Sequence, residues 1–409
     1  MVVALWDIGA AALVALPATF RIAWDWRWHK ALSRGACPMD RPHRAVSPRA
    51  ASAAPPTSDA AVTLIVCTHN DLEMLQSNWA FWRGQQFPDH WSVEWLVVDD
   101  GSQDGTLEWL TALEANDDQL TVVHHAKSKP GKKDALAAGI RAARHEMLVM
   151  TDADCRPQPF WAASMAQSLT AQETPEVHSA DGPLRLDVSL GICLPDGGPA
   201  LLGFDAIRVA FQYSGEALTN RPYMGVGRNI AYHRSAWEKV GGFDAHADLA
   251  SGDDDLFVQD AVRSQLRIGM VQPPSAAALN RVLPASDWND GWQRKQRHLS
   301  TANRYSRGTR RILALDAVLD PLIIAAAVAA PLGLLHKFVW IPVAAMTLAA
   351  GVRAFTLSLF SQVWGKDAFP WWQCLLWGPI RWMLLATATV RNAFTSSPTW
   401  TQRAPTSRS

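Results

Sequence analysis

Short apolar runs alternate with longer helical patterns between residues 62 and 152, and this alternation most limits the folds open to the chain. Four runs have the length and β-branched content of buried strands, and each of the first three precedes a segment with helical periodicity. The strands are predicted at 62–66, 93–99, 120–125 and 147–152, and the helices at 71–84, from 106, and at 132–144. Repeated strand–helix units predict an α/β fold, in which helices cover both faces of a mostly parallel sheet.

The composition excludes several classes of protein. The 409 residues include 38 Lys and Arg against 38 Asp and Glu, so the formal net charge is zero and a nucleic-acid-binding protein is not expected. Apolar residues make up 48% of the chain, which is enough for a sizeable core and excludes a disordered chain. The five cysteines are scattered and show no CxxC spacing. They are interpreted as reduced thiols.

The first 23 residues form an apolar segment in which only Asp7 and Arg21 are charged. About 20 apolar residues can cross a bilayer, so a transmembrane helix is predicted at 1–23. A cleaved signal peptide is the alternative, but such a peptide begins with basic residues, and here they follow the apolar run. Basic residues favour the cytoplasmic side, so the region after the helix is predicted to be cytoplasmic. Residues 24–60 are predicted to be a basic juxtamembrane segment and a linker rich in Pro, Ala and Ser.

The chain becomes strongly apolar again after a domain predicted at 61–310. The later segments are apolar stretches at 313–335, 338–360 and about 370–390, within a membrane region at 311–395, and a tail at 396–409. The first two stretches are long enough for a helical hairpin. The third carries Arg381 and several tryptophans, so it either crosses the bilayer or lies along its surface. We therefore expect a multi-pass protein of the inner (cytoplasmic) membrane, whose transmembrane helices flank a cytoplasmic domain.

Polar residues follow the first two predicted strands. Thr68 and Asn70 come just after the first strand, and Asp99 and Asp100 end the second. In open α/β sheets ligands bind beyond the carboxyl ends of the strands, so these side chains are expected to face one crevice. Asp99 is suited to accept hydrogen bonds from a nucleoside base or ribose. An ordinary strand-ending turn is the alternative interpretation of Asp-Asp-Gly-Ser.

The third and fourth units add a candidate phosphate site and a candidate cation site. Gly131 and Lys132 stand at the start of a predicted helix, where the helix N-terminus and an ammonium group both suit phosphate. A solvated basic turn is the alternative. Asp152 and Asp154 follow the fourth strand, and in extended backbone both point to the same side. Two such carboxylates can hold Mg²⁺ or Mn²⁺ when the phosphates of a nucleotide complete the shell.

Three adjacent acids, Asp253, Asp254 and Asp255, precede a helical pattern that runs to Arg263. Adjacent carboxylates repel one another, so surface solubility alone does not account for them. They are interpreted as the source of a general base that removes a proton from an attacking hydroxyl group. Capping of the following helix is the alternative.

Together these residues resemble the family-2 glycosyltransferases, over about residues 62–300. The resemblance implies a GT-A fold, an α/β domain that binds a nucleotide sugar and carries a DxD metal site. It implies Asp152 and Asp154 as ligands of Mg²⁺ or Mn²⁺, with Asp154 the more direct ligand, and Asp253 or Asp254 as the base. The residues implied in donor binding are Thr68, Asn70, Asp99, Asp100, Lys132, Asp152, Gly227 and Asn229.

A segment near the end of the domain resembles the QxxRW motif of membrane-bound relatives, and this likeness adds Gln293 and Arg297 to the implied donor-binding residues. The segment departs from the motif because these two residues are four positions apart and His298 stands where tryptophan is expected. The departures argue against processive polymer synthesis. A basic juxtamembrane helix that contacts anionic lipid is the alternative.

The implied activity is an inverting, metal-dependent hexosyl transfer from a nucleotide-diphosphate sugar to a hydroxyl acceptor, which is lipid-linked or a growing glycan. The acceptor attacks in one step while Asp253 or Asp254 takes its proton. The expected partners are the donor, the acceptor and membrane lipid. Two alternatives stay open. A nucleotidyltransferase on a similar fold would have a glycine-rich basic signature after the first strand, and an inactive membrane scaffold would have lost the acids.

Overall fold

The structure is a computed structural model. It describes residues 18–31, 60–128, 131–170, 186–197, 200–271, 279–285, 287–329, 348–349 and 351–359. Most of the predicted helix at 1–23, most of the predicted linker, the segment at 370–390 and the tail lie outside the described residues.

A seven-stranded sheet forms the centre of the domain, in the order β3-β2-β1-β4-β7-β5-β8. Its first half consists of β1 (Ala61–Thr68), β2 (Ser92–Asp99), β3 (Leu120–His124) and β4 (Met147–Asp152). These four strands are parallel and lie where the sequence predicts them. The register aligns Thr68 with Asp99 and Cys67 with Asp152, so β1, β2 and β4 end at one edge of the sheet.

The second half of the sheet mixes directions. β7 (Ile230–His233) is antiparallel to both β4 and β5 (Val188–Leu190), and β8 (Ile268–Met270) is parallel to β5. β6 (Ile192–Pro195) and β9 (Leu279–Val282) form a separate parallel pair. Strands of three or four residues carry too little periodicity to be located from sequence.

Helices cover both faces of the parallel half, as the sequence predicts. These helices are α2 (Leu72–Arg83), α3 (Thr106–Glu114) and α4 (Lys133–Ala142). Successive residues of a strand point to opposite faces. Leu64 accordingly shares a core cluster with Leu75 of α2, whereas Ile65 belongs to the cluster of Ile140 of α4.

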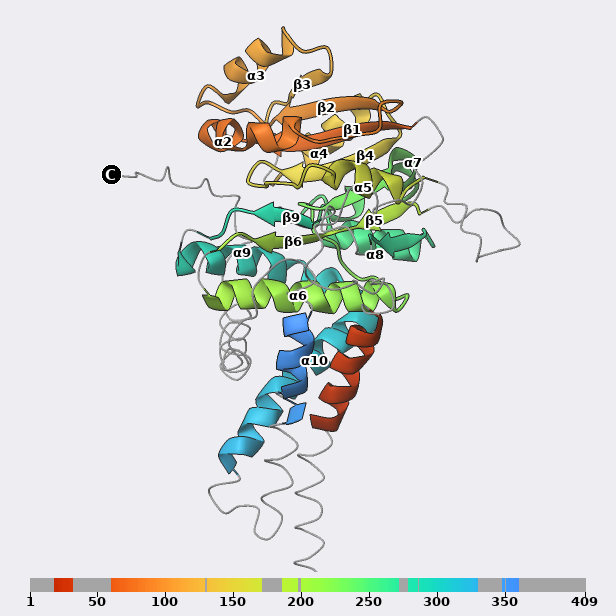
Figure 1. The fold of residues 1–409 in the computed structure, drawn as a ribbon, viewed down its shortest axis with the longest axis vertical. Coiled ribbons are helices and arrows are strands. Elements are labelled where there is room, and N and C mark those ends of the chain that lie inside the picture. The colour runs from red at the N-terminus through yellow and green to blue at the C-terminus, as the bar shows by residue number, and fades with distance from the viewer. Residues whose placement is uncertain are drawn as a thin grey trace, which may run out of the picture.

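The remaining helices follow the parallel half of the sheet. They are α5 (Trp161–Gln167), α6 (Ala200–Leu218), α7 (Arg234–Lys239), α8 (Asp255–Arg263), α9 (Trp288–Ser300) and α10 (Arg307–Ala329). In Figure 1, β6 and β9 lie at about the level of β5, and α6 lies between this level and α10. The sequence does not predict α6, because this helix buries polar side chains such as Arg208, Gln212 and Glu216 as well as apolar ones. A helix buried on several sides shows no simple amphipathic pattern.

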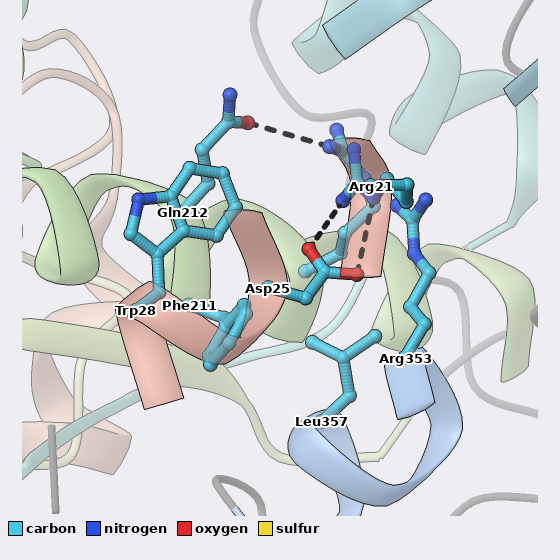
Figure 2. Close-up of a pocket in the computed structure, with 8 residues that line it drawn as sticks. Arg21, Asp25, Trp28, Phe211, Gln212, Arg353 and Leu357 are labelled. Carbon is cyan, nitrogen blue, oxygen red and sulfur yellow. Dashed lines mark hydrogen bonds and ion pairs between the residues drawn. The ribbon is translucent and has the colours of Figure 1, made fainter. Parts of the chain in front are cut away.

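A helix at 18–31 packs with α6, α10 and the helical residues 351–359 on the side away from the main sheet (Figure 1). It continues past residue 23, the predicted end of the first apolar segment, because Trp28 is buried against Phe211 of α6. Figure 2 shows a pocket between these helices. Its lining residues are Arg21, Asp25, Trp28, Arg208, Phe211, Gln212, Arg353 and Leu357.

Buried ion pairs fix this group of helices. Arg21 Nη2 lies 2.8 Å from Asp25 Oδ1, and Arg21 also pairs with Asp316 of α10. Arg208 Nη1 of α6 lies 3.4 Å from Asp316 Oδ2. Asp316 thus joins α10 to two other helices.

Among the described residues, no helix combines the length and the apolar character needed to cross a membrane.

Candidate functional site

The carboxyl ends of β1 and β2 form a buried polar corner. Thr68 and Asp99 are neighbours in the sheet register, and both side chains are buried. Asp99 Oδ2 accepts a hydrogen bond from the backbone N–H of Ser102 at 3.2 Å and lies 3.4 Å from His124 Nδ1. Asp99 Oδ1 and Thr68 Oγ1 have no hydrogen-bond partner among the described residues. Buried polar atoms are normally satisfied, so these two oxygens mark a place where a polar ligand can bind.

Asn70 connects the loops that follow β1 and β2. Its backbone N–H donates to Ser102 Oγ at 2.9 Å, and its Oδ1 accepts from the backbone N–H of Gln103 at 2.7 Å. Its φ of 54° lies in the left-handed region, which asparagine tolerates better than most residues. Asn70 therefore shapes the corner in which Thr68 and Asp99 lie.

Asp100 belongs to a second group of side chains beside this corner. It pairs with Lys127, and ligand atoms of Asp100, His125 and Asp134 lie within 4.8 Å of one another. His125 Nε2 is 3.3 Å from Asp134 Oδ2 and 4.0 Å from Asp100 Oδ1. Burial raises the pKa of Asp100, against the hydrogen bond and charge of Lys127. This group has suitable ligand types for a cation, but Lys127 already supplies positive charge to Asp100.

Lys132 joins the two acidic motifs. Its Nζ lies 2.7 Å from Asp152 Oδ1, at the end of β4, and 2.9 Å from Asp253 Oδ2, just before α8. Burial lowers the pKa of Lys132, but the charges of Asp152 and Asp253 outweigh burial and hold that pKa well above its ordinary value. Lys132 is therefore a fixed positive charge between the two motifs.

Lys133, the next residue, fixes the loop that carries Asp253. Its buried ammonium group donates to the backbone oxygen of His246 and, at 3.1 Å, to that of Ser251. The two lysines at the start of α4 thus have different environments. Lys132 contacts acidic side chains, and Lys133 holds the backbone that positions one of them.

Arg228 brings a second cation to the same acids. Its Nε lies 3.4 Å from Asp152 Oδ2 and 3.3 Å from Asp154 Oδ1. Burial raises the pKa of Asp152, but the charges of Lys132 and Arg228 outweigh burial and lower it to about 2. We refer to Lys132, Asp152, Asp154, Arg228 and Asp253 as the charged cluster.

The three adjacent acids have three different environments. Asp253 faces Lys132. Asp254 caps α8, because its Oδ1 accepts from the backbone N–H of Asp255 at 2.7 Å while its Oδ2 accepts from that of Gly227 at 2.8 Å. Asp255 is buried and accepts hydrogen bonds from the hydroxyl groups of Thr301 and, at 2.6 Å, Tyr305. Asp253 is therefore the candidate for the base, and Asp254 fits the capping interpretation.

The pKa of Asp254 gives a further indication of its role. Burial, followed by the charges of Asp253 and Asp255, raises the pKa of Asp254 to about 8. Asp254 is therefore mostly protonated at neutral pH and is a poor base there. Its two hydrogen bonds to backbone N–H groups instead hold the Gly227 loop against α8.

The Asp152 and Asp154 carboxylates fit a hard divalent cation. One oxygen from each lies within 3.4 Å of the same Arg228 nitrogen, so a single positive centre can contact both. Both donors are oxygen, which Mg²⁺ and Mn²⁺ prefer. The donor set is therefore compatible with the ion that the sequence predicts.

Of the other predicted donor-binding residues, Gly227 and Arg297 are near the charged cluster, and Gln293 is not known to contact it. Gly227 lies at the cluster, since a Cβ atom on it would be 3.0 Å from Asp253 Oδ2 and 3.1 Å from Lys132 Nζ. Arg297 of α9 is partly buried, and its charge acts on Asp152 and Asp253. Gln293 is exposed on α9.

The structure does not bring the Asn229 side chain into the charged cluster. This side chain is fully buried, with Oδ1 accepting from Trp161 Nε1 at 2.8 Å and Nδ2 donating to the backbone oxygen of Ile192 at 2.8 Å. These contacts join α5 to β6. Asn229 thus supports the loop next to the cluster.

Sequence reasoning missed Arg228 as a functional candidate. Its backbone oxygen accepts hydrogen bonds from Thr151 Oγ1 at 3.1 Å and from the buried Asn280 Nδ2 at 2.6 Å, which fix the residue beside β4. The antiparallel ladder between β4 and β7 ends at Met150 and Ile230, and Arg228 lies in the turn that precedes β7. The antiparallel direction of β7 brings this turn to the carboxyl end of β4, and the sequence does not reveal that direction.

Part of this domain is similar in sequence to known proteins. Residues 63–176 match the sequence model of glycosyl transferase family 2. This range contains β1 to β4 and therefore Thr68, Asp99, Lys132 and the Asp152–Asp154 pair. A curated relative, a dolichol-phosphate mannosyltransferase from Mycosarcoma maydis, is 29% identical over 83 residues, which are 20% of this chain and 28% of that protein. The chain thus matches less than a third of that relative's length.

One solved structure shares the architecture. The mannosyltransferase PcManGT from Pyrobaculum calidifontis, solved in complex with GDP-Man and Mn²⁺, aligns with a TM-score of 0.53 and 20% identity, over 95% of this chain and 99% of that one. TarS from S. aureus aligns at a TM-score of 0.38 and 16% identity, over 74% and 49%, which is too weak to establish a common fold. The first match supports the predicted α/β fold of GT-A type, and the family match supports the predicted glycosyltransferase class.

Proposed function

We propose that this protein is an inverting glycosyltransferase that moves a sugar from a nucleotide diphosphate to a hydroxyl group on a lipid-linked or glycan acceptor. One observation carries the proposal: the Lys132 ammonium group pairs with both Asp152 and Asp253. A candidate cation ligand and a candidate base thus stand on either side of one positive charge. The family match over residues 63–176 gives this arrangement its chemical class.

The polar corner is the proposed nucleoside site. Thr68 Oγ1 and Asp99 Oδ1 are buried and have no partner among the described residues, so they can bind a base or ribose without giving up another hydrogen bond. GDP-mannose is the first donor to test, because PcManGT was solved with it and the curated relative is named as a mannosyltransferase.

The chain's own residues account for the proton transfer and the leaving group. The acceptor oxygen attacks the anomeric carbon, its proton passes to the Asp253 carboxylate, and the bond to the diphosphate breaks. Lys132 and Arg228 place positive charge where the departing diphosphate gains negative charge. Asp254 keeps the Gly227 loop and the start of α8 together.

Asp152 and Asp154 would hold Mg²⁺ or Mn²⁺, and the bound ion would neutralise charge on the diphosphate. The carboxylate ligands and their shared position beside Arg228 support this assignment.

The proposal includes attachment of the domain to the inner (cytoplasmic) membrane through the apolar segments, with the charged cluster on the cytoplasmic side. Large apolar side chains on or just beside the described parts of these segments support it. Phe20, Trp26 and Phe355 are each about half exposed, at 55%, 51% and 55%. Aromatic side chains of this kind favour the headgroup region of a bilayer.

The decisive experiment is a binding and hydrolysis panel with the full-length chain. GDP-mannose, UDP-glucose and UDP-N-acetylglucosamine are titrated with and without Mn²⁺, and release of the nucleoside diphosphate is followed. We expect one donor to bind more tightly with Mn²⁺ and to be turned over slowly in water or rapidly with acceptor lipid. Absence of binding by every nucleotide sugar, with and without metal, would rule the proposal out.

A further inference from the structure

Arg228 occupies the position from which a cation contacts both carboxylates of the candidate metal pair. Its Nε is nearly equidistant from Asp152 Oδ2 and Asp154 Oδ1, at 3.4 and 3.3 Å. The backbone at Arg228 is fixed by hydrogen bonds to its carbonyl oxygen from Thr151 of β4 and Asn280 of β9. The backbone thus places the guanidinium group beside the acids, and the side chain is 21% exposed, so it is in contact with solvent.

The charges of the site balance without a metal ion. Asp152, Asp154 and Asp253 carry three negative charges, and the cations that act on them are Lys132, Arg228 and Arg297. A divalent ion alone would leave this site with excess positive charge, and a nucleoside diphosphate alone would leave it with excess negative charge. Binding both restores the balance, because the charge of the ion offsets that of the diphosphate.

We propose that Arg228 is an internal counter-cation that competes with the divalent ion for Asp152 and Asp154 until a nucleoside diphosphate is bound. The donor phosphates then attract the guanidinium group away from the carboxylates and leave these to the ion. Arg228 is therefore a positioning residue that makes metal binding depend on the donor. This inference rests on the proposed function, since it takes Asp152 and Asp154 as the cation site.

The test measures Mn²⁺ binding to the full-length chain by the loss of the free-ion electron paramagnetic resonance signal, with no acceptor and no turnover. The variant Arg228→Gln removes the charge, and Arg228→Lys keeps it. Arg267→Gln is the matched control, because Arg267 is 53% exposed and pairs with Asp187 rather than with the charged cluster.

We expect Arg228→Gln to bind Mn²⁺ in the absence of nucleotide about tenfold more tightly than the wild type does. The variant removes the repulsion between one positive charge and a divalent ion a few Å away, and this repulsion has that size even at the dielectric constant of water. Arg228→Lys and Arg267→Gln should match the wild type. An unchanged Mn²⁺ affinity in folded Arg228→Gln would overturn the inference.

A second measurement uses the unaltered protein, so it does not depend on the folding of a variant. Mn²⁺ is titrated with and without GDP, and Asp154→Ala in parallel separates ion held by the protein from ion held by the nucleotide alone. The inference requires GDP to raise the affinity of the wild-type protein for Mn²⁺, and equal affinities would overturn it. If GDP raises the affinity but Arg228→Gln leaves Mn²⁺ binding unchanged, the inference fails while the proposed function stands. If no form binds Mn²⁺ or a nucleotide, both fail.

Discussion

Lys132 and Asp253 lie 2.9 Å apart, although one directly precedes α4 in the parallel half and the other precedes α8 in the second half of the domain. Lys133 reinforces this approach by binding the backbone oxygens of His246 and Ser251. The ion pair therefore joins Lys132, which lies in the range that matches the family model, to Asp253, which lies outside that range.

Replacement of Asp253 by Asn should remove turnover while leaving the donor bound. Asn keeps the shape of the side chain and can still accept a hydrogen bond from Lys132, but it cannot take a proton from the acceptor. Loss of a general base typically costs about 10²- to 10⁴-fold in rate. We expect a fall of that size in kcat and less than about a threefold change in donor Kd, measured by steady-state assay and by donor titration.

The control for this variant is Asp248→Asn, which alters an acid that is 57% exposed and pairs with Arg304. It should keep wild-type kcat. Full activity of Asp253→Asn would remove Asp253 from the proposed mechanism and leave the assignment of the base open.

Replacement of Gly227 by Ala should disturb the charged cluster without unfolding the domain. The new Cβ would lie 3.0 Å from Asp253 Oδ2 and 3.1 Å from Lys132 Nζ, so the ends of two side chains must move while the backbone need not. A small misplacement of catalytic groups costs about 10- to 100-fold in rate. We expect kcat/KM to fall by that factor with little change in Tm. Gly203→Ala, where a Cβ meets nothing within 4 Å, should be unaffected in both respects.

The parallel half of the fold and its site residues were predictable because their signals are local. The strands β1, β2 and β4 are mostly buried runs, and a polar residue at the carboxyl end of each points to the same edge whatever the rest of the chain does. The positions of Thr68, Asp99 and Asp152 follow from this rule, and that of Lys132 follows from the start of a predicted helix.

The second half of the site was less predictable because long-range pairing creates it. The antiparallel pairing of β7 with β4 brings the turn that holds Arg228 to the carboxyl end of β4, and no local pattern reports strand direction for a strand of four residues. The roles of the three adjacent acids likewise depend on what each faces. Asp254 accepts hydrogen bonds from the backbone of Gly227 and Asp255, whereas Asp253 pairs with Lys132.

The pH dependence of stability should reveal the protonated state of Asp254. Its pKa is raised from 3.8 to about 8 in the folded protein, first by burial and then by the charge of Asp253. The folded chain therefore holds a proton that the unfolded chain has released, so the contribution of Asp254 to stability falls as pH rises from about 4 to 8. Asp254→Asn lacks this dependence.

The comparison is made by urea unfolding of the wild type and Asp254→Asn at pH 5, 7 and 8. We expect the free energy of unfolding of the wild type to fall relative to that of the variant by at most about 1.4 kcal/mol per pH unit. Asp255 is present in both proteins, so its own titration largely cancels in the difference. Parallel pH profiles for the two proteins would show that Asp254 is ionised in the folded state at neutral pH.

The buried ion pairs between the helix at 18–31, α6 and α10 should contribute strongly to the stability of that helical group. Asp316 receives both Arg21 and Arg208, and its side chain is 1% exposed. Removing one member of a buried charge network leaves the others without compensation and costs about 3–5 kcal/mol. Asp316→Ala should therefore lower Tm and expose the helix at 18–31 to protease, both measured on the full-length chain.

The control Asp248→Ala breaks an exposed pair with Arg304, and such pairs contribute about 0–1 kcal/mol, so its Tm should stay within a few degrees of the wild type. Equal Tm values and equal protease sensitivity for the two variants would show that the network does not hold these helices together.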